Sequence, residues 1–170
     1  MRPIVRFALL GILLSPAFVH AEWAGFDTYF DEQQETSWEE LQAKLPPYPK
    51  AENQQEFYVS GVAGNRYFVD KTSLYVDTDG VVRYVLTVNA RGGATNVSFE
   101  GIRCHTRERK IYAIGQADGT WSRARDDKWR PIASRSSLSY HRPLADAYFC
   151  PVGVIVNTPQ EALQNIRSGW

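Results

Sequence analysis

The chain has 170 residues, with 19 basic and 19 acidic side chains, and 44% of its residues are hydrophobic. This length suits one domain with a sizeable core. The even charge balance gives no support for nucleic-acid binding, which normally needs a strongly basic surface. Two cysteines and three histidines leave few residues from which a metal site or a Cys–His catalytic centre could be built.

Residues 1–21 have the pattern of a secretory signal peptide. Arg2 and Arg6 precede an apolar run at residues 7–19, and Val19-His20-Ala21 places small residues at the −3 and −1 positions before Glu22. As a helix this run would reach only ~20 Å across a hydrocarbon core of about 30 Å, which disfavours a membrane anchor. We expect cleavage before Glu22 and export to the periplasm or outer membrane.

The mature chain would carry a net charge of −2, because the leader removes two arginines and no acid from the balanced sequence. No cysteine follows the apolar run, so lipid attachment is not expected. No second apolar stretch approaches the ~18 residues that a membrane-spanning helix requires. We therefore expect no transmembrane segment in the mature chain.

Residues 22–55 are expected to precede the domain as a polar segment with one short helix. The stretch TSWEELQAKL, residues 36–45, begins with two residues that can cap a helix. Trp38, Leu41 and Leu45 then recur at helical spacing. The prolines of PPYP would end this helix, since proline lacks an amide proton, and a polar linker follows. We place the domain itself at residues 56–168.

From Phe57 the pattern becomes alternating and predicts strands in FYVSG, RYFVD, SLYV and VVRYVLTVNAR. Asp79-Gly80 lies between the last two runs and predicts a hairpin. In the stretch VVRYVLTVNAR one strand face would be apolar, with Val82, Tyr84, Leu86, Val88 and Ala90. The other face carries Arg83, Thr87, Asn89 and Arg91 and is expected to be solvated.

Further turns are predicted at Gly92-Gly93 and Asp118-Gly119, with a strand pattern in TNVSFEGIRCHTRERKIYAIG, TWSRA and WRPI. No helical segment interrupts these strands, so they should form an antiparallel meander. Residues 137–150 are interpreted as a loop or short helix, and VGVIV as an added strand. TPQEALQNIR predicts a last helix, with Thr158 as its cap and Ala162, Leu163 and Ile166 as its apolar stripe.

Cys104 and His105 are adjacent within a basic run, which raises the question of a catalytic pair. Neighbours on a strand point to opposite faces, so the imidazole would not lie against the sulfur. In an exported protein a second, distant cysteine is the simpler partner. We expect a disulfide between Cys104 and Cys150 in preference to a reactive thiol or a metal ligand.

Other catalytic centres find little support. A metal site could draw only on His105, His141 and scattered acids. Ser137 and Ser139 lie near His141 but outside any Gly-x-Ser-x-Gly motif. Glu100 is interpreted as a residue of a solvated strand face rather than an acid catalyst. We predict no catalytic residue, no metal and no cofactor.

Basic side chains are concentrated between residues 100 and 135. A possible anion-binding face is formed by Arg103, Arg107, Arg109, Lys110, Arg123 and Arg125. Its partners could be an anionic envelope component, such as lipopolysaccharide phosphates or a glycan, or the acidic surface of another envelope protein. An ordinary solvated face, with these cations paired to Glu100, Glu108, Asp126 and Asp127, is the favoured alternative. Trp38, Trp121 and Trp129 are expected to anchor the core.

Two resemblances extend this interpretation. YFVDKTSLYVDTDGVVRYVLTV, NVSFEGIRCHTRERKIYAIGQADGTWSRARDDKWRPI and AYFCPVGVIV resemble the CNP-one-like family, a group of small exported and largely uncharacterised proteins of Gram-negative proteobacteria. The layout is also similar to that of bacterial surface-adhesin domains, which implies an antiparallel sheet with a packed helix and a disulfide at equivalent positions. Neither resemblance brings a catalytic residue.

We therefore expect an α+β fold, a curved antiparallel meander with the C-terminal helix packed on it and one disulfide. The first functional hypothesis is a non-enzymatic exported envelope protein that acts as a binding or structural module. The alternatives are an unrecognised envelope hydrolase or transferase, and an inhibitor or assembly factor for another envelope protein. A pocket with converging polar groups would favour an enzyme, and a shallow basic or aromatic face would favour binding.

Overall fold

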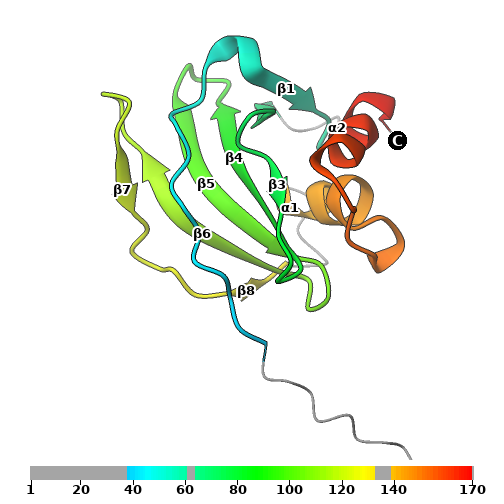
Figure 1. The fold of residues 1–170 in the computed structure, drawn as a ribbon. Helices are drawn as coiled ribbons and strands as arrows, with labels where there is room; N and C mark the ends of the chain where they lie inside the picture. Colours follow the sequence, from blue (N-terminus) through cyan, green and yellow to red (C-terminus); the bar gives the residue numbers. More distant parts are fainter. Residues whose placement is uncertain (1–37, 61–63, 133–138, 170) are drawn as a thin grey trace, which may run out of the picture. The chain divides into compact units, whose positions relative to one another are not determined.

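The computed structural model describes residues 38–60, 64–132 and 139–169. Eight strands in these ranges form one antiparallel sheet in the order β1-β2-β4-β5-β6-β7, with β3 paired to β4 and β8 paired to β6 (Figure 1). The strands are β1 (Gln54–Phe57), β2 (Arg66–Asp70), β3 (Tyr75–Val76), β4 (Val81–Asn89), β5 (Thr95–Arg103), β6 (Glu108–Gly115), β7 (Trp121–Arg123) and β8 (Arg130–Pro131). The predicted meander is confirmed.

Both Asp-Gly sequences form turns between neighbouring strands, as predicted. Gly80 and Gly119 have φ of 76° and 81°, a left-handed conformation that glycine adopts without a steric penalty. Each amide donates to the carbonyl three residues earlier, Asp77 at 3.1 Å and Gln116 at 3.0 Å. These turns set the register of the hairpins that carry the candidate site.

The centre of the sheet is the long β4–β5 pair, which is in register from Val81 opposite Arg103 to Asn89 opposite Thr95. On the other side of β5, the register with β6 shifts between Phe99 and Glu100. Such a bulge bends the strand and increases its twist. The curvature expected from the sequence has this local cause.

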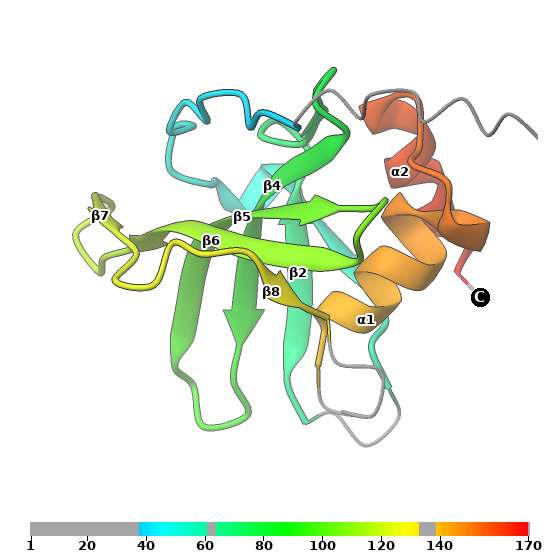
Figure 2. The same cartoon turned by 90° about the horizontal axis from the view of Figure 1, so that it is seen from below.

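One face of the sheet is covered by helical segments, as Figures 1 and 2 show. These are α1 (His141–Pro143), a π-helical turn η2 (Leu144–Phe149), a 3-10 turn η3 (Pro151–Gly153) and α2 (Pro159–Ser168). Tyr84, Leu86 and Ile102 of the sheet share a buried core with Leu144 and Phe149. We call this side the helical face.

The last helix forms as the sequence predicts. The Thr158 side chain accepts a hydrogen bond from the Glu161 amide at 3.1 Å and so caps the helix. Ala162, Leu163 and Ile166 are all buried, which confirms the predicted apolar stripe. The helix packs against η2 and β1 and helps to close the helical face.

The strand predicted in VGVIV is wrong. Val152 and Gly153 have φ of 50° and 81°, a left-handed turn that cannot continue a strand. Val152 is 97% exposed and Val154 63% exposed, whereas Val156 is buried. The first predicted strand, FYVSG, is also displaced: β1 ends at Phe57, and residue 61 lies outside the described residues.

The opposite face of the sheet is crossed by residues 38–50, which we call the strap (Figure 2). Ala43 and Tyr48 of the strap pack on a second, smaller core made by Val85, Phe99 and Ala113. We call this side the strap face. A short 3-10 turn, η1 (Ala51–Asn53), connects the strap to β1.

The helix predicted over residues 36–45 is wrong for the part that the structure describes, because residues 38–45 have no regular secondary structure. The backbone of this segment bonds to the sheet instead of to itself. Leu41 donates its amide to Asp79 and accepts at its carbonyl from Arg83. Tertiary contacts thus override a weak local helix preference. Thr36 and Ser37, the predicted caps, lie outside the described residues.

The solvated face predicted for β4 is wrong over most of its length. Arg83 and Thr87, expected in water, are 0% and 3% exposed, and Val85 is fully buried. The strap and its contacts cover this side. On this face only Asn89, at the end of the strand, is partly exposed, and Arg91 beyond it is exposed as predicted.

Candidate functional site

The strap is anchored at the β3–β4 turn through Asp79. The Asp79 carbonyl accepts a hydrogen bond from Trp38 Nε1 at 2.7 Å, and its carboxylate accepts one from the Leu41 amide at 3.0 Å. The buried Arg83 donates to the same carboxylate at 2.6 Å. Burial acts to raise the pKa of Asp79, but the hydrogen bonds from Arg83 and Leu41 outweigh it and hold the pKa below its ordinary value. Asp79 therefore both forms the turn and, as an ionised carboxylate, anchors the strap.

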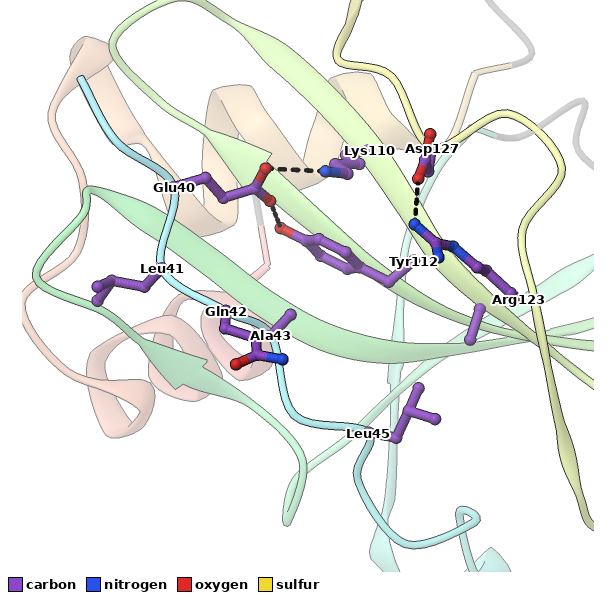
Figure 3. A pocket seen from close by; sticks show the side chains of 10 residues that line it. Glu40, Leu41, Gln42, Ala43, Leu45, Lys110, Tyr112, Arg123 and Asp127 are labelled. Atoms are coloured by element: carbon purple, nitrogen blue, oxygen red, sulfur yellow. Dashed lines mark hydrogen bonds and ion pairs between the residues drawn. The ribbon is translucent and has the colours of Figure 1, made fainter. Parts of the chain in front are cut away.

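A second anchor is the Glu40 carboxylate (Figure 3). It accepts hydrogen bonds from Lys110 Nζ and the Tyr112 hydroxyl, both at 2.8 Å, and from Trp129 Nε1 at 3.2 Å. Burial raises the pKa of Tyr112, and the hydrogen bond and charge of Glu40 raise it further against the opposing charge of Arg83. The hydroxyl therefore stays protonated and remains a donor to Glu40.

A third anchor holds the far end of the strap at the β6–β7 turn. The Tyr48 hydroxyl donates to the Gln116 carbonyl, and Trp121 Nε1 donates to the Pro46 carbonyl, both at 3.0 Å. A Cβ atom added to Gly115 would lie 2.9 Å from the Tyr48 ring, which is closer than such contacts allow. Glycine at this position lets Tyr48 lie directly on β6.

Between the strap and strands β6 and β7 lies a groove of about 440 Å³ (Figure 3). This volume falls in the range of ~300–1,000 Å³ that is usual for ligand pockets. Residues 40–43 and Leu45 form the strap side of the groove. The sheet side is formed by Lys110, Tyr112, Ala113, Arg123 and Asp127. The wall is thus mixed: leucines and alanines supply apolar surface, and ion pairs lie at its polar parts.

A second hollow of about 570 Å³ also involves the strap. Leu41, Gln42 and Leu45 line both hollows, and Thr72 and Tyr75 line only the second. Leu41 is 44% exposed and Leu45 is 58% exposed. The strap therefore presents two exposed leucines between hollows, in contrast to the core-facing role that a helix would have given them.

Three of the six predicted anion-binding cations gather on the strap face. Arg103 lies over the Trp38 ring, with its guanidinium 3.8 Å from the ring centroid. Lys110 pairs with Glu40, and Arg123 pairs with Asp127 at 2.9 Å. Lys110 and Arg123 line the groove beside Tyr112, so an aromatic ring and cations do share this face.

The other three cations lie elsewhere. Arg109 is opposite Ile102, a residue of the core of the helical face, and therefore belongs to that face. Arg107 lies in the β5–β6 turn and pairs with Asp146 of η2 at 2.5 Å. Arg125 is exposed in the segment between β7 and β8. The structure brings together half of the predicted face, and anion binding by any of these residues stays a prediction.

The solvated position predicted for Glu100 is wrong, because Glu100 is fully buried on the helical face. Its carboxylate receives the Ser98 hydroxyl at 2.6 Å, the Tyr84 and Tyr140 hydroxyls at 3.0 and 3.1 Å, and His141 Nε2 at 2.8 Å. Burial acts to raise the pKa of Glu100, but His141 and the hydroxyls outweigh it and lower the pKa. Four partners thus stabilise a buried carboxylate.

The burial of Glu100 could have been predicted from the register of the β4–β5 hairpin. Gly92-Gly93 closes the β4–β5 hairpin and places Glu100 opposite Tyr84, a residue of the predicted apolar face. Alternation along the strands would then have assigned both residues to one face. The partners from Tyr140 and His141 could not be inferred, because they come from a segment about forty residues away.

The Glu100–His141 pair is shielded from solvent, with side-chain exposures of 0% and 6%. A general acid or base must come within hydrogen-bond reach of its substrate, whereas these groups contact protein. The pair holds the start of α1 on the sheet. Within the described ranges, no group of three or more His, Cys, Asp and Glu side chains is arranged to hold a metal ion.

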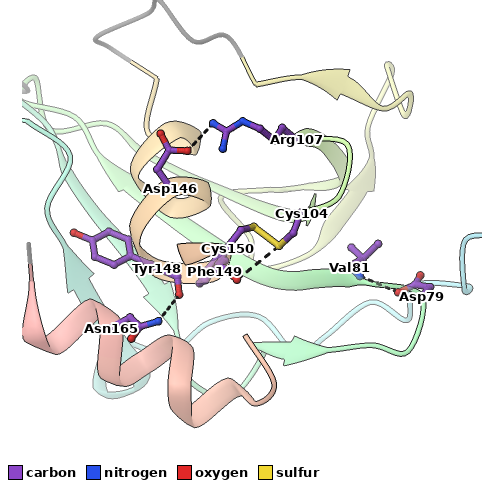
Figure 4. Close-up of a disulfide and its surroundings, with 9 residues drawn as sticks. All are labelled: Asp79, Val81, Cys104, Arg107, Asp146, Tyr148, Phe149, Cys150 and Asn165. Carbon is purple, nitrogen blue, oxygen red and sulfur yellow. Dashed lines mark hydrogen bonds and ion pairs between the residues drawn. A yellow bond between two sulfur atoms is a disulfide. The ribbon is translucent and has the colours of Figure 1, made fainter. Parts of the chain in front are cut away.

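The predicted disulfide between Cys104 and Cys150 is confirmed (Figure 4). Both cysteines are nearly fully buried, and they tie the end of β5 to the end of η2. Asn165 of α2 donates to the Tyr148 carbonyl at 3.0 Å, which links the last helix to the same region. Cys104 is therefore a covalent tie of the helical face and no part of the groove.

None of the helices in the described ranges combines the length and apolar character needed to cross a bilayer. Comparison with known proteins gives a match to the model of the CNP1-like family over residues 33–167. The chain is also 26% identical over 146 residues to Cryptic neisserial protein 1 of Neisseria gonorrhoeae (strain ATCC 700825 / FA 1090), covering 76% of this chain and 71% of that protein. No solved structure gives a significant match. The family match covers both the strap and the disulfide-tied sheet, and the chain belongs to the CNP1-like family.

Proposed function

We propose that this protein is exported to the cell envelope and acts there as a non-enzymatic binding module, with the groove beside the strap as its ligand site. The observation that carries this proposal is the groove itself. It joins exposed apolar side chains to cations and an aromatic ring on one sheet face. Mixed walls of this kind are usual in binding sites, where a few polar groups orient a mainly apolar contact.

A binding role is favoured over catalysis by the way the charged groups of the groove are engaged. Glu40 is bound to Lys110, and Asp127 to Arg123, so each carboxylate is neutralised by a cation. The other carboxylate of interest, Glu100, is buried with His141. Among the described residues that line the groove, both carboxylates are paired with cations and none is a histidine.

Export is supported by the leader pattern of Arg2, Arg6 and the apolar run, together with a buried disulfide that suits an oxidising compartment. Intact-mass measurement of the protein from its native cells should give an N-terminus at Glu22 in the envelope fraction. An intact Met1 in the cytoplasmic fraction would overturn this part of the proposal.

The groove is tested by site-specific photo-crosslinking in native cells. Benzoylphenylalanine placed at Gln42, an exposed residue that lines the groove, should give a covalent adduct. The matched control is the same residue at Gln160, which is also exposed but lies on α2. Equal adducts at both positions, or none at Gln42, would refute a ligand site in the groove.

A further inference from the structure

The strap offers unpaired backbone groups beside the groove. In the described part of the chain, residues 42–45 make no hydrogen bond through their amides or carbonyls, whereas Leu41 and Pro46 on either side do. Gln42, Lys44 and Leu45 are exposed and Ala43 is partly exposed, so this part of the strap lies at the surface. An unpaired row of this kind is a template for another chain in extended conformation.

The apolar part of the groove lies directly next to this row. Ala43 and Leu45 line the groove from the strap, and Ala113 lines it from β6. Both alanines are small side chains of the groove wall, and Leu45 is exposed for contact. A chain paired to residues 42–45 would place alternate side chains toward the sheet, because successive side chains of an extended chain point to opposite sides.

The charges around the groove favour an acidic occupant. Arg123 is 84% exposed, and its partner in the structure is the half-exposed Asp127. An exposed pair of this kind is weak and can exchange its carboxylate for another. Lys44, an exposed cation of the strap that forms no ion pair among the described residues, lines the neighbouring hollow.

We infer that the groove binds an extended polypeptide segment of another envelope protein, which pairs with the backbone of residues 42–45, inserts an apolar side chain between Leu45 and Ala113, and presents a carboxylate to Arg123. This inference rests on the proposed function of the groove. A polypeptide is favoured over a glycan or a lipid phosphate because the row of unpaired amides and carbonyls matches another backbone. The cations alone would accept any anion.

The test uses the mature protein and a positional library of acetylated, amidated hexapeptides, with binding followed by fluorescence polarisation. Bound sequences should share an acidic residue and an apolar residue at fixed spacing. Arg123→Gln should weaken the best peptide at least tenfold. The matched control is Arg66→Gln, which removes an exposed arginine paired with Glu56 at a distant site and should leave affinity unchanged. Peptides N-methylated at either the odd or the even amides should be compared, and only one of the two sets should lose binding.

The remaining outcomes overturn the inference in distinguishable ways. Equal selection of basic and acidic peptides would remove the role of Arg123. Binding of lipopolysaccharide or heparin that depends on Arg123, with no peptide selected, would replace the polypeptide by an anionic envelope component and leave the groove as a ligand site. Absence of a crosslink at Gln42 in cells would remove both proposals. Melting temperatures of the two arginine variants confirm that each remains folded.

Discussion

The helical face of the sheet is closed by α1, η2 and α2, whereas the strap face is crossed by one segment without regular hydrogen bonding. On the helical face the side chains that meet are large and buried, such as Tyr84 against Phe149, with ring centroids 5.1 Å apart. A disulfide ties the covering segment to β5. This face combines apolar burial with a covalent link, and both stabilise the fold.

The strap face relies on separate polar anchors at Asp79, Glu40 and Tyr48. Its core is smaller, and hollows border the strap between its anchors. Regions with few buried apolar contacts open more easily than the rest of a fold. The helical face carries the larger core and the disulfide, and the strap face carries the groove that we propose as a binding site.

The two largest expected effects concern the helical face, and the first comes from removing its covalent link. The cysteines are 46 positions apart, and the chain-entropy model gives about 4 kcal/mol for a loop of this size. Cys104→Ser and Cys150→Ser should each lower the free energy of unfolding by roughly this amount in urea titrations. The double variant should cost little more than either single one, since all three remove the same link. Titratable thiols in unreduced, denatured protein would contradict this prediction.

Glu100→Ala should weaken the same face without touching the disulfide. It leaves His141, Tyr84 and Tyr140 without their shared acceptor, and breaking a buried pair typically costs about 3–5 kcal/mol. Urea titration of the variant measures the loss. Glu52→Ala, which removes an exposed carboxylate, is the control and should leave stability almost unchanged. A similar small loss for both variants would mean that the Glu100 cluster does not stabilise the fold.

The pH dependence of this cluster follows from the lowered pKa of Glu100. A carboxylate with a folded pKa below its ordinary value of 4.5 stabilises the fold above that value, and this stabilisation is lost as the pH falls through the folded pKa. The difference in unfolding free energy between wild type and Glu100→Gln should therefore be full above about pH 5 and should narrow in more acidic buffer. Other carboxylates are common to both proteins and cancel. A difference that widens on acidification would reverse the sign of the assigned shift.

On the strap face, Gly115→Ala tests the packing of the Tyr48 ring against Gly115. The added methyl would meet Val97 at 2.8 Å and the Tyr48 ring at 2.9 Å, and overpacking of this kind costs about 1–3 kcal/mol. We expect a lower melting temperature and a change in the total tryptophan emission, since Trp121 packs on Tyr48. Gly92→Ala is the control, because an added Cβ there has open space. Equal effects of the two variants would show that Tyr48 does not need glycine beneath it.

The elements that the sequence predicts well are those whose signals are local. The Asp79-Gly80 hairpin and the Thr158-capped helix each depend on residues within a few positions of one another. The strap was missed because its helical spacing is outweighed by bonds to Asp79 and Arg83, some forty positions away. A local pattern cannot register such contacts.

The candidate site was only partly predictable for the same reason. Lys110 and Arg123 were identified as cations of one face, and both line the groove. The other wall of the groove comes from the strap, for which the sequence pattern predicts a separate helix. Whether a strand face is solvated or covered depends on distant segments, so the sequence pattern predicts exposure for Arg83 and Glu100, which are both fully buried.

The smallest expected effect is a local one. Glu40→Gln keeps the shape of the side chain but removes the negative charge of the carboxylate, which accepts hydrogen bonds from Lys110 and Tyr112. The pair is partly exposed, so we expect a loss of only about 1 kcal/mol. Native-state hydrogen exchange should then show faster exchange of the Leu41 amide, while the central amides of β4 keep their protection. Glu39→Gln, one residue earlier and exposed, should change neither. Uniformly faster exchange across both faces would mean that the strap and the helical face open together. This result would contradict the proposed difference in stability between the two faces.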